Sequence, residues 1–280
     1  MPYTLSELWL YPVKSLGGVR VTEARVTPRG FDGDRRFLLV DADARFLTQR
    51  ELPELVWFQP ELAGDTLRLT DRRGGREPLA VPRYPSPTAD RLPVQIWADT
   101  VEAQRVDDAA DAWFSAALDR PVRLVYLPDD SHRLVDPDYA RTPADETSFA
   151  DGYPVLLIGQ ASLDALNARL DEPLEMRRFR PNLVVTGSTP HEEDGWAEFR
   201  LGPALFYGVK PCGRCVVTTL DPDTGTPHPR REPLRSLAGY RTRNRKILFG
   251  QNLLIGSDGG TVRVGDALTV VRQHPPEPAA

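Results

Sequence analysis

The sequence predicts a mostly β fold with a few helices, an α+β protein in which strands dominate. Proline and glycine are abundant, with 27 and 21 residues among 280, and they divide the chain into many short segments. Several of those segments alternate apolar with polar residues or are rich in β-branched side chains, as strands are. The chain is 40% hydrophobic and 27% charged, which is typical of a globular protein with an ample core, in one large domain or two.

The first predicted strands, residues 5–13 and 19–26, are joined by a polar turn that contains Lys14, Ser15 and two glycines. Glycine lets the backbone approach a bound anion closely, and Lys14 offers a positive charge. A hairpin turn with an exposed lysine is the alternative, and this turn considered alone favours that alternative.

A charged turn at residues 30–36 leads into an apolar strand at residues 37–40. Side chains alternate along a strand, so Arg35 and Arg36 should point to opposite faces. Arginine in such a place is usually a salt-bridged surface residue, although its planar guanidinium also binds phosphate. The polar signature is repeated after the next apolar pair by Thr48-Gln49-Arg50.

The middle of the chain predicts further strands and the first helix. The strands are residues 67–69, 94–96, 101–103 and 122–127. Asp99 and Thr100 should close the hairpin between the second and third of these strands. Asp107 and Asp108 predict the N-terminal cap of a helix. The apolar side of that helix should consist of Ala109, Ala112, Trp113, Ala116 and Ala117.

A long polar stretch, residues 128–151, has no predicted secondary structure, and a loop of this length in a compact domain is either functional or disordered. The run at residues 155–159 is apolar on both faces and predicts a buried strand. Ser162 is predicted to cap the helix that follows. The buried residues of that helix should be Leu163, Leu166 and Leu170.

Three arginines, Arg177, Arg178 and Arg180, precede another apolar strand at residues 183–185. Burying a guanidinium without an anion costs free energy, so this cluster is a candidate oxyanion or phosphate site. A solvated basic edge is an equally good interpretation of this segment alone.

Both cysteines, Cys212 and Cys215, lie in the segment that follows an apolar strand at residues 201–209. Nearby positive charge from Lys210 and Arg214 favours thiolates, which are nucleophiles and soft metal ligands. The segment therefore predicts a metal–thiolate site.

Three other interpretations of the cysteine pair stay open. A structural zinc site needs four ligands, and of the four histidines only His228 is close in sequence. A thioredoxin-like pair should open a helix, whereas the β-branched run at residues 216–219 predicts a strand. A pair of merely structural cysteines is the third alternative.

The C-terminal part predicts one short helix and three strands. Pro233 suits the first turn of the helix, with Leu234 and Leu237 as its buried contacts. The strands are residues 249–255, 261–264 and 268–271, the last two joined by a hairpin turn at Gly265 and Asp266. Residues 275–280 form a polar tail.

Bulk properties exclude several classes of function. The net charge of -5 argues against a surface for nucleic-acid polymers, since such binding depends on basic residues that neutralise phosphates. No apolar run reaches the roughly 18 residues that a membrane span needs. The N-terminus has no signal-peptide pattern, so we expect a cytoplasmic protein with reduced cysteines.

Six segments, in their order along the chain, resemble the MOSC family, which is named after the C-terminal part of molybdenum cofactor sulfurase. The family includes bacterial MOSC reductases and the mitochondrial amidoxime-reducing component. The segments are Tyr11-Pro12-Val13-Lys14-Ser15, Asp34-Arg35-Arg36-Phe37, Phe149-Ala150-Asp151-Gly152-Tyr153-Pro154, Phe179-Arg180-Pro181-Asn182, Cys212-Gly213-Arg214-Cys215 and Phe249-Gly250-Gln251. The resemblance implies an N-terminal β-barrel domain at residues 1–120, packed on a MOSC β-barrel domain at residues 121–275, with residues 276–280 as a tail.

The resemblance also implies a molybdenum cofactor, Mo-molybdopterin, bound between the two domains. Cys215 matches the catalytic thiolate that ligates molybdenum, and Cys212 matches a partner cysteine that does not bind the metal. The implied cofactor-binding positions are Lys14, Ser15, Arg36, Asp151, Gly152, Tyr153, Arg180, Asn182, Gly213, Arg214 and Asn252. This set agrees with the chemistry of the cofactor, because a phosphate needs Arg and Lys and a pterin edge needs amide and backbone partners. Thr218 and Asp221 are expected to orient the cysteine motif.

The function that the resemblance implies is a molybdenum-dependent oxidoreductase. It would reduce N-hydroxylated compounds such as hydroxylaminopurines, amidoximes or hydroxamic acids, in a detoxifying role. Electrons would come from a separate ferredoxin- or flavoprotein-type donor, since no cysteine follows Cys215 and an iron–sulfur cluster needs four cysteine ligands. Pyridoxal phosphate is not expected. The alternative is a carrier or handling protein for the cofactor or for sulfur, which turns over no small substrate.

Overall fold

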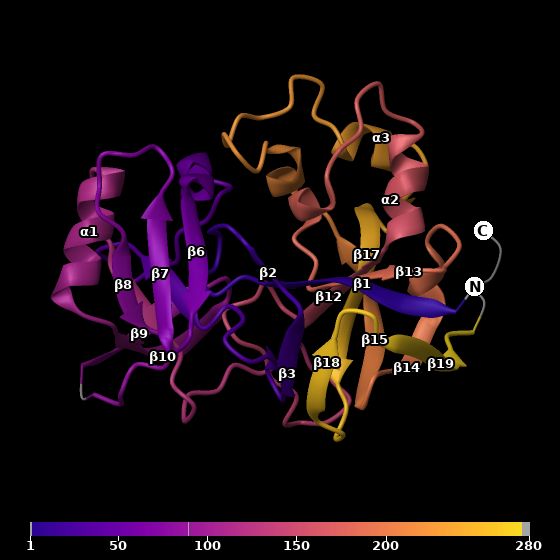
Figure 1. Cartoon of the computed structure of the whole chain (residues 1–280), viewed down its shortest axis with the longest axis horizontal. Coiled ribbons are helices and arrows are strands. Elements are labelled where there is room, and N and C mark those ends of the chain that lie inside the picture. Colours follow the sequence, from indigo (N-terminus) through magenta and orange to yellow (C-terminus); the bar gives the residue numbers. More distant parts are fainter. Residues whose placement is uncertain (1, 89, 276–280) are drawn as a thin grey trace.

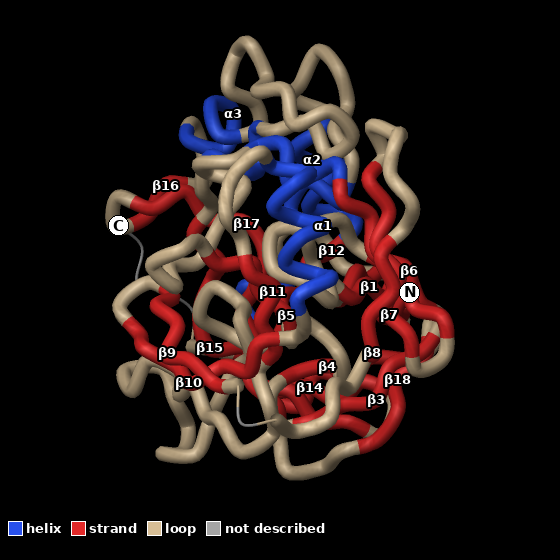
Figure 2. The backbone as a smooth tube through the Cα atoms, turned by 90° about the vertical axis from the view of Figure 1, so that its left-hand side faces the viewer, coloured by secondary structure: helices blue, strands red, loops and turns tan. Residues whose placement is uncertain are grey.

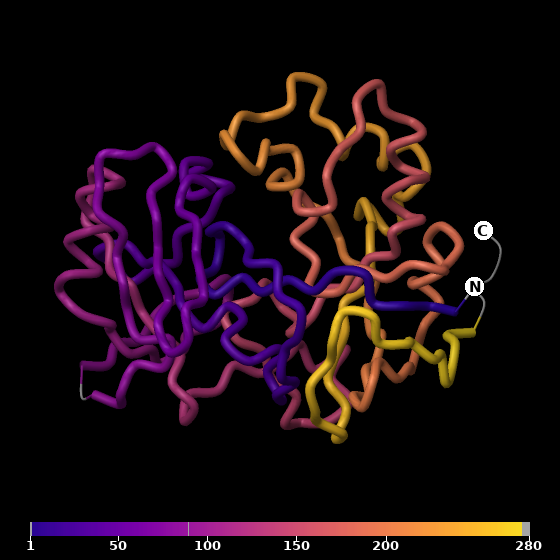
Figure 3. The backbone as a smooth tube through the Cα atoms, in the orientation of Figure 1, coloured from indigo at the N-terminus to yellow at the C-terminus, as the bar shows by residue number. Residues whose placement is uncertain are grey.

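The structure, a computed structural model, describes residues 2–88 and 90–275 (Figure 1). Two strand-rich units lie side by side, one mostly indigo to magenta and the other mostly orange to yellow (Figure 1). Figure 3 shows that the N-terminal segment begins in the second unit and then crosses to the first. The predicted tail at residues 276–280 lies outside the described residues. Along the described parts of the chain, no helix is both long and apolar enough to cross a membrane.

The second unit is a closed β-barrel. Around the ring, its strands are β12 (Val155–Gly159), β13 (Leu183–Thr186), β1 (Tyr3–Leu10), β19 (Ala267–Gln273), β14 (Trp196–Leu201), β15 (Ala204–Gly213) and β17 (Lys246–Ile255). The sheet closes because β17 also pairs with β12. The barrel interior is filled by apolar side chains such as Leu8, Trp196 and Phe206. The predicted fold class is thereby confirmed.

Several short strands extend this barrel. β2 (Val19–Val21) pairs with β1, and β16 (Thr242–Arg243) pairs with β17. A separate sheet consists of β18 (Gly260–Arg263), β3 (Glu23–Thr27) and β4 (Gly30–Phe31). Side chains from β3 and β4 join the barrel core. Between β1 and β2 the chain passes through the first unit, where Val13 and Leu16 are buried in the core that contains Phe58. β1 and β2 thus join the second unit although they precede the strands of the first unit in sequence.

The first unit consists of two sheets and a helix, with two apolar cores. One sheet contains β5 (Phe37–Val40), β11 (Arg123–Tyr126), β10 (Asp99–Arg105) and β9 (Arg91–Ile96). The other contains β6 (Phe58–Ala63), β7 (Thr66–Asp71) and β8 (Leu79–Pro82), preceded by the 3₁₀ helix η1 (Pro53–Trp57). The helix α1 (Asp108–Leu118) inserts Phe114 into the same core as Phe37 and Phe58.

Helices are few and short, as Figure 2 shows. Besides α1 they are α2 (Gln160–Asn167) and α3 (Leu234–Ala238), with the 3₁₀ helices η2 (Met176–Phe179), η3 (Glu192–Gly195) and η4 (Val216–Thr219). α2 and α3 share a smaller core against the barrel, in which Leu163, Leu237 and Phe249 are buried. The predicted buried contacts Leu163, Leu166 and Leu237 are confirmed.

The predicted cap of α1 is confirmed, but its predicted buried side is right only at Ala117 and at the half-buried Trp113. The Asp107 carboxylate accepts a hydrogen bond from the Ala110 N–H. The helix buries Ala110, Asp111, Phe114 and Ala117, whereas most of the predicted alanines are exposed. The reason is that the Asp111 carboxylate accepts the N–H of Leu124 at 2.8 Å, which fixes this polar residue against the sheet.

Ser162 does not cap α2. The N-cap is Gly159, and Ser162 lies inside the first turn, where its hydroxyl donates to the buried carboxylate of Glu193 at 2.8 Å. The same hydroxyl accepts the His191 N–H at 2.7 Å. Tertiary partners far along the sequence therefore replace the expected local cap.

Two predicted hairpins also differ. Asp99 pairs with Ile96, so the turn between β9 and β10 is Trp97 and Ala98, not Asp99 and Thr100. β18 and β19 do not form a hairpin at all, since β18 pairs with β3 while β19 pairs with β1 and β14. The predicted strand at residues 155–159 matches β12 to the residue, and the apolar strand predicted after the charged turn is β5.

Candidate functional site

A cavity of about 600 Å³ lies where the two units meet. Residues 14–15 and 48–50 line it from the side of the first unit, and residues 150–153 line it from the end of the long polar loop. The barrel side contributes residues 178–182 and the whole cysteine motif, residues 210–215. Segments that are far apart in sequence thus converge on one space, and the loop at residues 128–151 provides part of its wall.

The cavity lining is strongly cationic. Asp151 is its one carboxylate among the described residues. Its cationic side chains are Lys14, Arg35, Arg50, Arg178, Arg180, Lys210, Arg214, Arg245 and Lys246. Because the protein as a whole has a net charge of -5, this concentration of positive charge is local. A concave site lined by one sign of charge attracts ligands of the opposite sign, so the cavity is suited to an anion.

The cysteine motif runs from the end of β15 into a short helix. Cys215 has an extended backbone and forms the N-cap of η4. The predicted strand at residues 216–219 is therefore wrong. The Thr218 hydroxyl donates to the Cys215 carbonyl at 3.0 Å and the Thr219 hydroxyl donates to the Val216 carbonyl at 2.7 Å. Threonine can make such bonds three residues back, which stabilises the helical turn.

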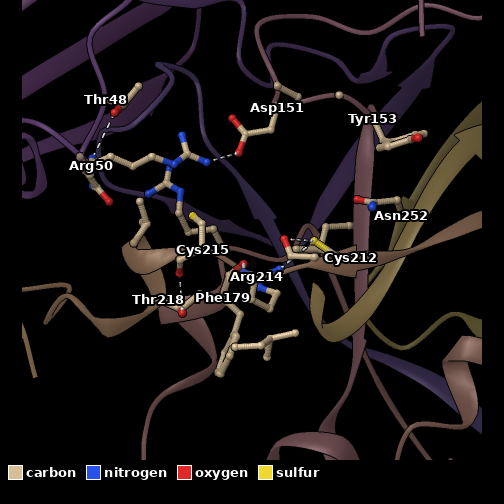
Figure 4. Close-up of a pocket in the computed structure, with 18 of the residues that line it drawn as sticks. Thr48, Arg50, Asp151, Tyr153, Phe179, Cys212, Arg214, Cys215, Thr218 and Asn252 are labelled. Atoms are coloured by element: carbon tan, nitrogen blue, oxygen red, sulfur yellow. Dashed lines mark hydrogen bonds and ion pairs between the residues drawn. The ribbon is translucent and has the colours of Figure 1, made fainter. Parts of the chain in front are cut away.

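The two cysteines are free and point in different directions. Figure 4 shows the Cys215 sulfur toward Arg50 and the Cys212 sulfur toward Asn252. Cys212 lies within β15 and accepts a hydrogen bond from Arg214 at 3.1 Å. The strand expected after the motif was the reason in the sequence to set aside a thioredoxin-like pair, and that strand is absent. The different directions of the two sulfurs still distinguish this motif from such a pair.

A zinc site made of protein ligands alone is also not supported. Within residues 2–88 and 90–275, no group of three or more His, Cys, Asp or Glu side chains could hold a metal ion. Zinc in structural sites takes four such ligands. A metal at Cys215 would need its remaining ligands from another molecule.

Arg50 is the side chain that sequence reasoning missed. Its guanidinium lies between Asp151 and the Cys215 sulfur, and donates to Asp151 at 3.1 Å (Figure 4). It stacks on the ring of Trp97 at 4.5 Å, and its backbone N–H donates to the Thr48 hydroxyl. Burial opposes its charge, but Asp151 and Cys215 more than compensate and raise the pKa of Arg50. The only signal in the sequence was the polar triplet at residues 48–50.

Lys14 is not an exposed turn residue, since only 6% of its surface is accessible. Its ammonium group forms an ion pair with Asp151. Burial lowers the pKa of Lys14 to about 8, although Asp151 partly offsets that effect. Burial raises the pKa of Asp151, but Lys14 and Arg50 outweigh this and hold it below the usual range. The neighbouring Ser15 carbonyl accepts a hydrogen bond from Gln49 at 2.6 Å, which fixes the turn.

Arg36 does not face the cavity, which corrects its predicted place in the site. Its guanidinium donates to the Leu127 carbonyl and to Asp129, and it covers the ring of Tyr126 at 4.9 Å. Strand alternation is not the reason, because both residues precede β5 and Arg35 lies in a turn with a left-handed backbone, φ 49°. Arg35 is the one that lines the cavity.

Arg180 and Asn182 both line the cavity but differ in their availability. Arg180 donates to the Leu16 carbonyl at 2.7 Å and lies 4.3 Å from the ring of Tyr11. Burial lowers its pKa to about 10. The Asn182 side chain accepts from Arg35 at 2.8 Å and donates to the Trp9 carbonyl at 3.0 Å. Asn182 thus uses its amide to hold Arg35 and the chain, not to face a ligand.

Arg177 and Arg178 hold a neighbouring turn. Arg177 pairs with Asp223, and Arg178 pairs with Asp221 at 3.1 Å. The other oxygen of Asp221 accepts the N–H groups of Asp223 and Thr224, each at 2.9 Å. Asp221 therefore organises the turn after the motif, and its role in orienting the cysteines stays a prediction. Of the two arginines, only Arg178 lines the cavity.

The remaining predicted residues surround the Cys212 side of the cavity. Gly152, Tyr153, Gly213, Arg214 and Asn252 all line it. Arg214 donates to the Phe179 carbonyl at 2.6 Å, and its Nε is buried without a partner among the described residues. An unpaired buried donor costs free energy, so this atom fits a site that gains a ligand.

Fold and site together define a class: a protein with a closed β-barrel beside a second strand-rich unit, and a cationic cavity with a thiol at their junction. The chain belongs to the MOSC-domain family. Residues 3–121 match the MOSC N-terminal beta barrel domain, and residues 144–269 match the MOSC domain.

Named relatives align over almost the whole chain. Mitochondrial amidoxime-reducing component 1 of Homo sapiens is 33% identical, over 96% of this chain and 83% of that protein. Mitochondrial amidoxime reducing component 2 of Bos taurus is 31% identical, over 94% of this chain and 82% of that protein. Molybdenum cofactor sulfurase of Oryza sativa subsp. japonica is 33% identical over 88% of this chain, which spans 32% of that longer protein.

Proposed function

We propose that the protein is a molybdenum-cofactor-dependent reductase of N-hydroxylated compounds, such as hydroxylaminopurines, amidoximes or hydroxamic acids. The observation that carries this proposal is the convergence of Cys215 and cationic side chains from both units on one cavity. Two of the named relatives are amidoxime-reducing components, which supports the substrate class.

The residues present fit a phosphate-bearing pterin cofactor. Cys215 would supply the thiolate ligand to the metal, which is a soft donor suited to such a site. Lys14, Arg180 and Arg214 would bind the terminal phosphate, since charge-assisted hydrogen bonds are the strongest available to it. The polar pterin edges would be met by the side-chain amide of Asn252 and by the backbone of Gly152. Within the described residues, that side-chain amide makes no hydrogen bond.

The bound cofactor would supply the redox chemistry, and the protein would bind and orient the substrate. In the net reaction the N–O bond breaks, two electrons and two protons are consumed, and the oxygen leaves as water. The electrons would come from a separate ferredoxin- or flavoprotein-type donor. Arg50 would keep a positive charge beside the Cys215 sulfur and stay fixed by Asp151.

Removal of toxic N-hydroxylated compounds is the biological role that such an activity suggests. The cytoplasmic location expected from the sequence stays a prediction, and the amidoxime-reducing relatives are mitochondrial by name.

A carrier of the cofactor or of sulfur is the second candidate. The likeness to the molybdenum cofactor sulfurase of rice favours it. Such a protein would bind the cofactor at the same cavity but would consume no small substrate in steady state.

Turnover of benzamidoxime with an artificial reductant tests the proposal, on protein made in cells that synthesise the cofactor. The wild-type protein should convert many equivalents to benzamidine. Cys215→Ser should reduce turnover to background with an unchanged circular dichroism spectrum, because the metal loses its protein ligand. Cys212→Ser is the matched control and should retain most of the activity. A single turnover at most by the wild type would favour the carrier.

A further inference from the structure

Three cations at the outer edge of the cavity differ from the rest of its lining. Arg245 and Lys246 lie on the hairpin between β16 and β17, and Lys210 lies on β15. We call these three residues the outer rim. Elsewhere in the cavity, Lys14 and Arg50 share Asp151. Arg180 and Arg214 have no carboxylate partner among the described residues either, but they donate to the carbonyls of Leu16 and Phe179. In the part of the chain that the structure describes, no outer-rim side chain forms an ion pair or donates a hydrogen bond.

The backbone at Arg245 is unfavourable for an arginine. The hairpin pairs Arg243 with Lys246, so its two turn residues are Asn244 and Arg245, with φ of 48° and 61°. Turns of this type favour Asn followed by Gly, because a residue with a Cβ is strained at positive φ. A strained residue that persists beside a cavity motivates a functional explanation.

Lys246 extends over the cysteine motif. A Cβ placed on Gly213 would lie 3.7 Å from the Lys246 side chain, so this side chain runs alongside the segment between Cys212 and Arg214. The positive charge of Lys246 is exposed and belongs to the cavity lining. It is therefore available to a molecule that enters toward the cysteines.

Lys210 lies against a pair of aromatic rings. Its ammonium group is 3.5 Å from the centre of the Tyr139 ring, and Tyr139 meets Tyr153 edge-on with 6.1 Å between ring centres. Burial and the nearby carboxylates of Asp136 and Asp138 raise the pKa of Tyr153. The same two carboxylates disfavour a bound anion near Tyr153. An anion would consequently be attracted mainly by Arg245 and Lys246, and the ring of Tyr153 is a further part of the same cavity lining.

We infer that the outer rim recognises an anionic group on the substrate. The preferred substrates would be planar N-hydroxylated compounds that carry a carboxylate or phosphate away from the N–O bond. This inference rests on the proposed function. The cofactor phosphate has separate and more deeply placed partners in Lys14, Arg180 and Arg214, so the outer rim remains available to the substrate.

Two amidoximes that differ in one charge test the outer rim. The wild-type protein should reduce para-carboxybenzamidoxime with a higher kcat/KM than benzamidoxime. The double variant Arg245→Gly, Lys246→Gln should lower kcat/KM for the carboxylated compound about fivefold, chiefly through KM, because two partly screened charges are lost. The kcat/KM for neutral benzamidoxime should fall by far less, because that substrate carries no charge for the outer rim to bind. Arg68→Gln with Arg120→Gln, an equal charge change at exposed positions outside the cavity lining, should alter neither.

Stability and cofactor content separate this role from structural ones. Arg245→Gly should keep or raise the melting temperature, since glycine accepts the turn geometry. Molybdenum per chain should be unchanged in the double variant. A fall in molybdenum content, an equal loss for both substrates, or no loss for the carboxylated one would overturn the inference.

A binding measurement keeps the inference distinct from the proposed function. Calorimetry would compare para-carbamoylbenzoate with benzamide, neither of which contains an N–O bond. If the wild-type protein reduces no amidoxime yet binds the carboxylate more tightly, and the double variant loses only that preference, the outer rim stands and the reductase proposal fails. If no preference for the carboxylate exists, the outer rim is wrong even when benzamidoxime is reduced.

Discussion

At the scale of single residues, the site depends on buried positive charges that have too few carboxylate partners in the protein. Lys14 is buried with a pKa of about 8, and its one carboxylate partner, Asp151, is shared with Arg50. A buried ammonium in this state gains more from a bound anion than a solvated lysine would. The lysine is therefore a sensitive probe of whether an anion binds here.

Lys14 should make anion binding depend on pH. A bound phosphate raises the pKa of Lys14 above its value of about 8, so binding takes up a proton and affinity falls as the pH rises through 8. Retention of molybdenum during dialysis should be lower at about pH 9.5 than at about pH 7. Lys14→Arg, which stays charged, should remove this difference, and Lys14→Met should weaken retention at both values. Equal retention by the wild type at both values would count against Lys14 as an anion ligand.

Arg50 should matter for activity although it is absent from the predicted site. Arg50→Met removes the hydrogen bond to Asp151 and the charge beside Cys215. We expect a loss of turnover of about tenfold or more, the usual scale for a charge-assisted hydrogen bond. Arg50→Lys keeps the positive charge but loses the planar guanidinium, so its turnover should lie between those of the wild type and Arg50→Met. Wild-type turnover by Arg50→Met would exclude this role.

At the scale of elements, the turn after η4 supports the cysteine motif. The Asp221 carboxylate accepts two backbone N–H groups of this turn and pairs with Arg178, which lines the cavity. Asp221→Ala should lower molybdenum retention several-fold, with a loss of only about 1 kcal/mol in the free energy of unfolding. Asp43→Ala, at an exposed carboxylate in the first unit, is the control. Full retention by Asp221→Ala would refute this supporting role.

The sequence predicts helices and strands correctly where the burial of the residues agrees with their apolar–polar pattern. It fails where hydrogen-bond partners far along the chain determine the local structure. The all-apolar run at residues 155–159 gave β12 its correct bounds, and the apolar run after Arg36 was correctly expected to be a strand, β5. The β-branched run at residues 216–219 became helical because the hydroxyls of Thr218 and Thr219 found local carbonyls. Ser162 looked like a cap but bonds Glu193, about thirty residues away in sequence. Propensity alone carries no information about such partners.

At the scale of the whole molecule, the cavity exists because two units meet and are held together. Arg72 of the first unit forms an ion pair with Asp223 at 2.7 Å and donates to the Pro222 carbonyl at 3.0 Å. Gly225, at φ 72°, packs against Pro53 of the first unit. The turn at residues 221–225 thus joins the cysteine motif to the opposite unit.

Gly225→Ala should loosen this junction. A Cβ at Gly225 would lie 2.8 Å from the Pro53 carbonyl oxygen, and the positive φ adds strain. We expect a loss of about 1–3 kcal/mol in the free energy of unfolding, measured by denaturant titration, together with weaker cofactor retention. Gly64→Ala has a similar φ of 60° and no atom within 4 Å, so it should show only the smaller strain effect. Equal effects of both variants would mean that the contact with Pro53 contributes nothing.

The convergence of the two halves was predicted from the resemblance, whereas the assignment of segments to units was not. Lys14, Asp151, Arg180 and Cys215 do meet in one cavity. β1 belongs to the barrel of the second unit, because strand pairing across the whole chain decides which sheet it joins. Arg35 and Arg36 point to different surroundings, as expected, but not by strand alternation. Both precede β5, and Arg35 lies in a left-handed turn with φ 49°, which the sequence pattern did not indicate.

X-ray absorption at the molybdenum edge tests the central claim most directly, on wild-type protein and Cys215→Ser prepared in cells that synthesise the cofactor. The wild type should contain molybdenum with one more sulfur neighbour than the variant, because Cys215 contributes that ligand. The same number of sulfur neighbours in both proteins, or zinc in place of molybdenum, would contradict the account.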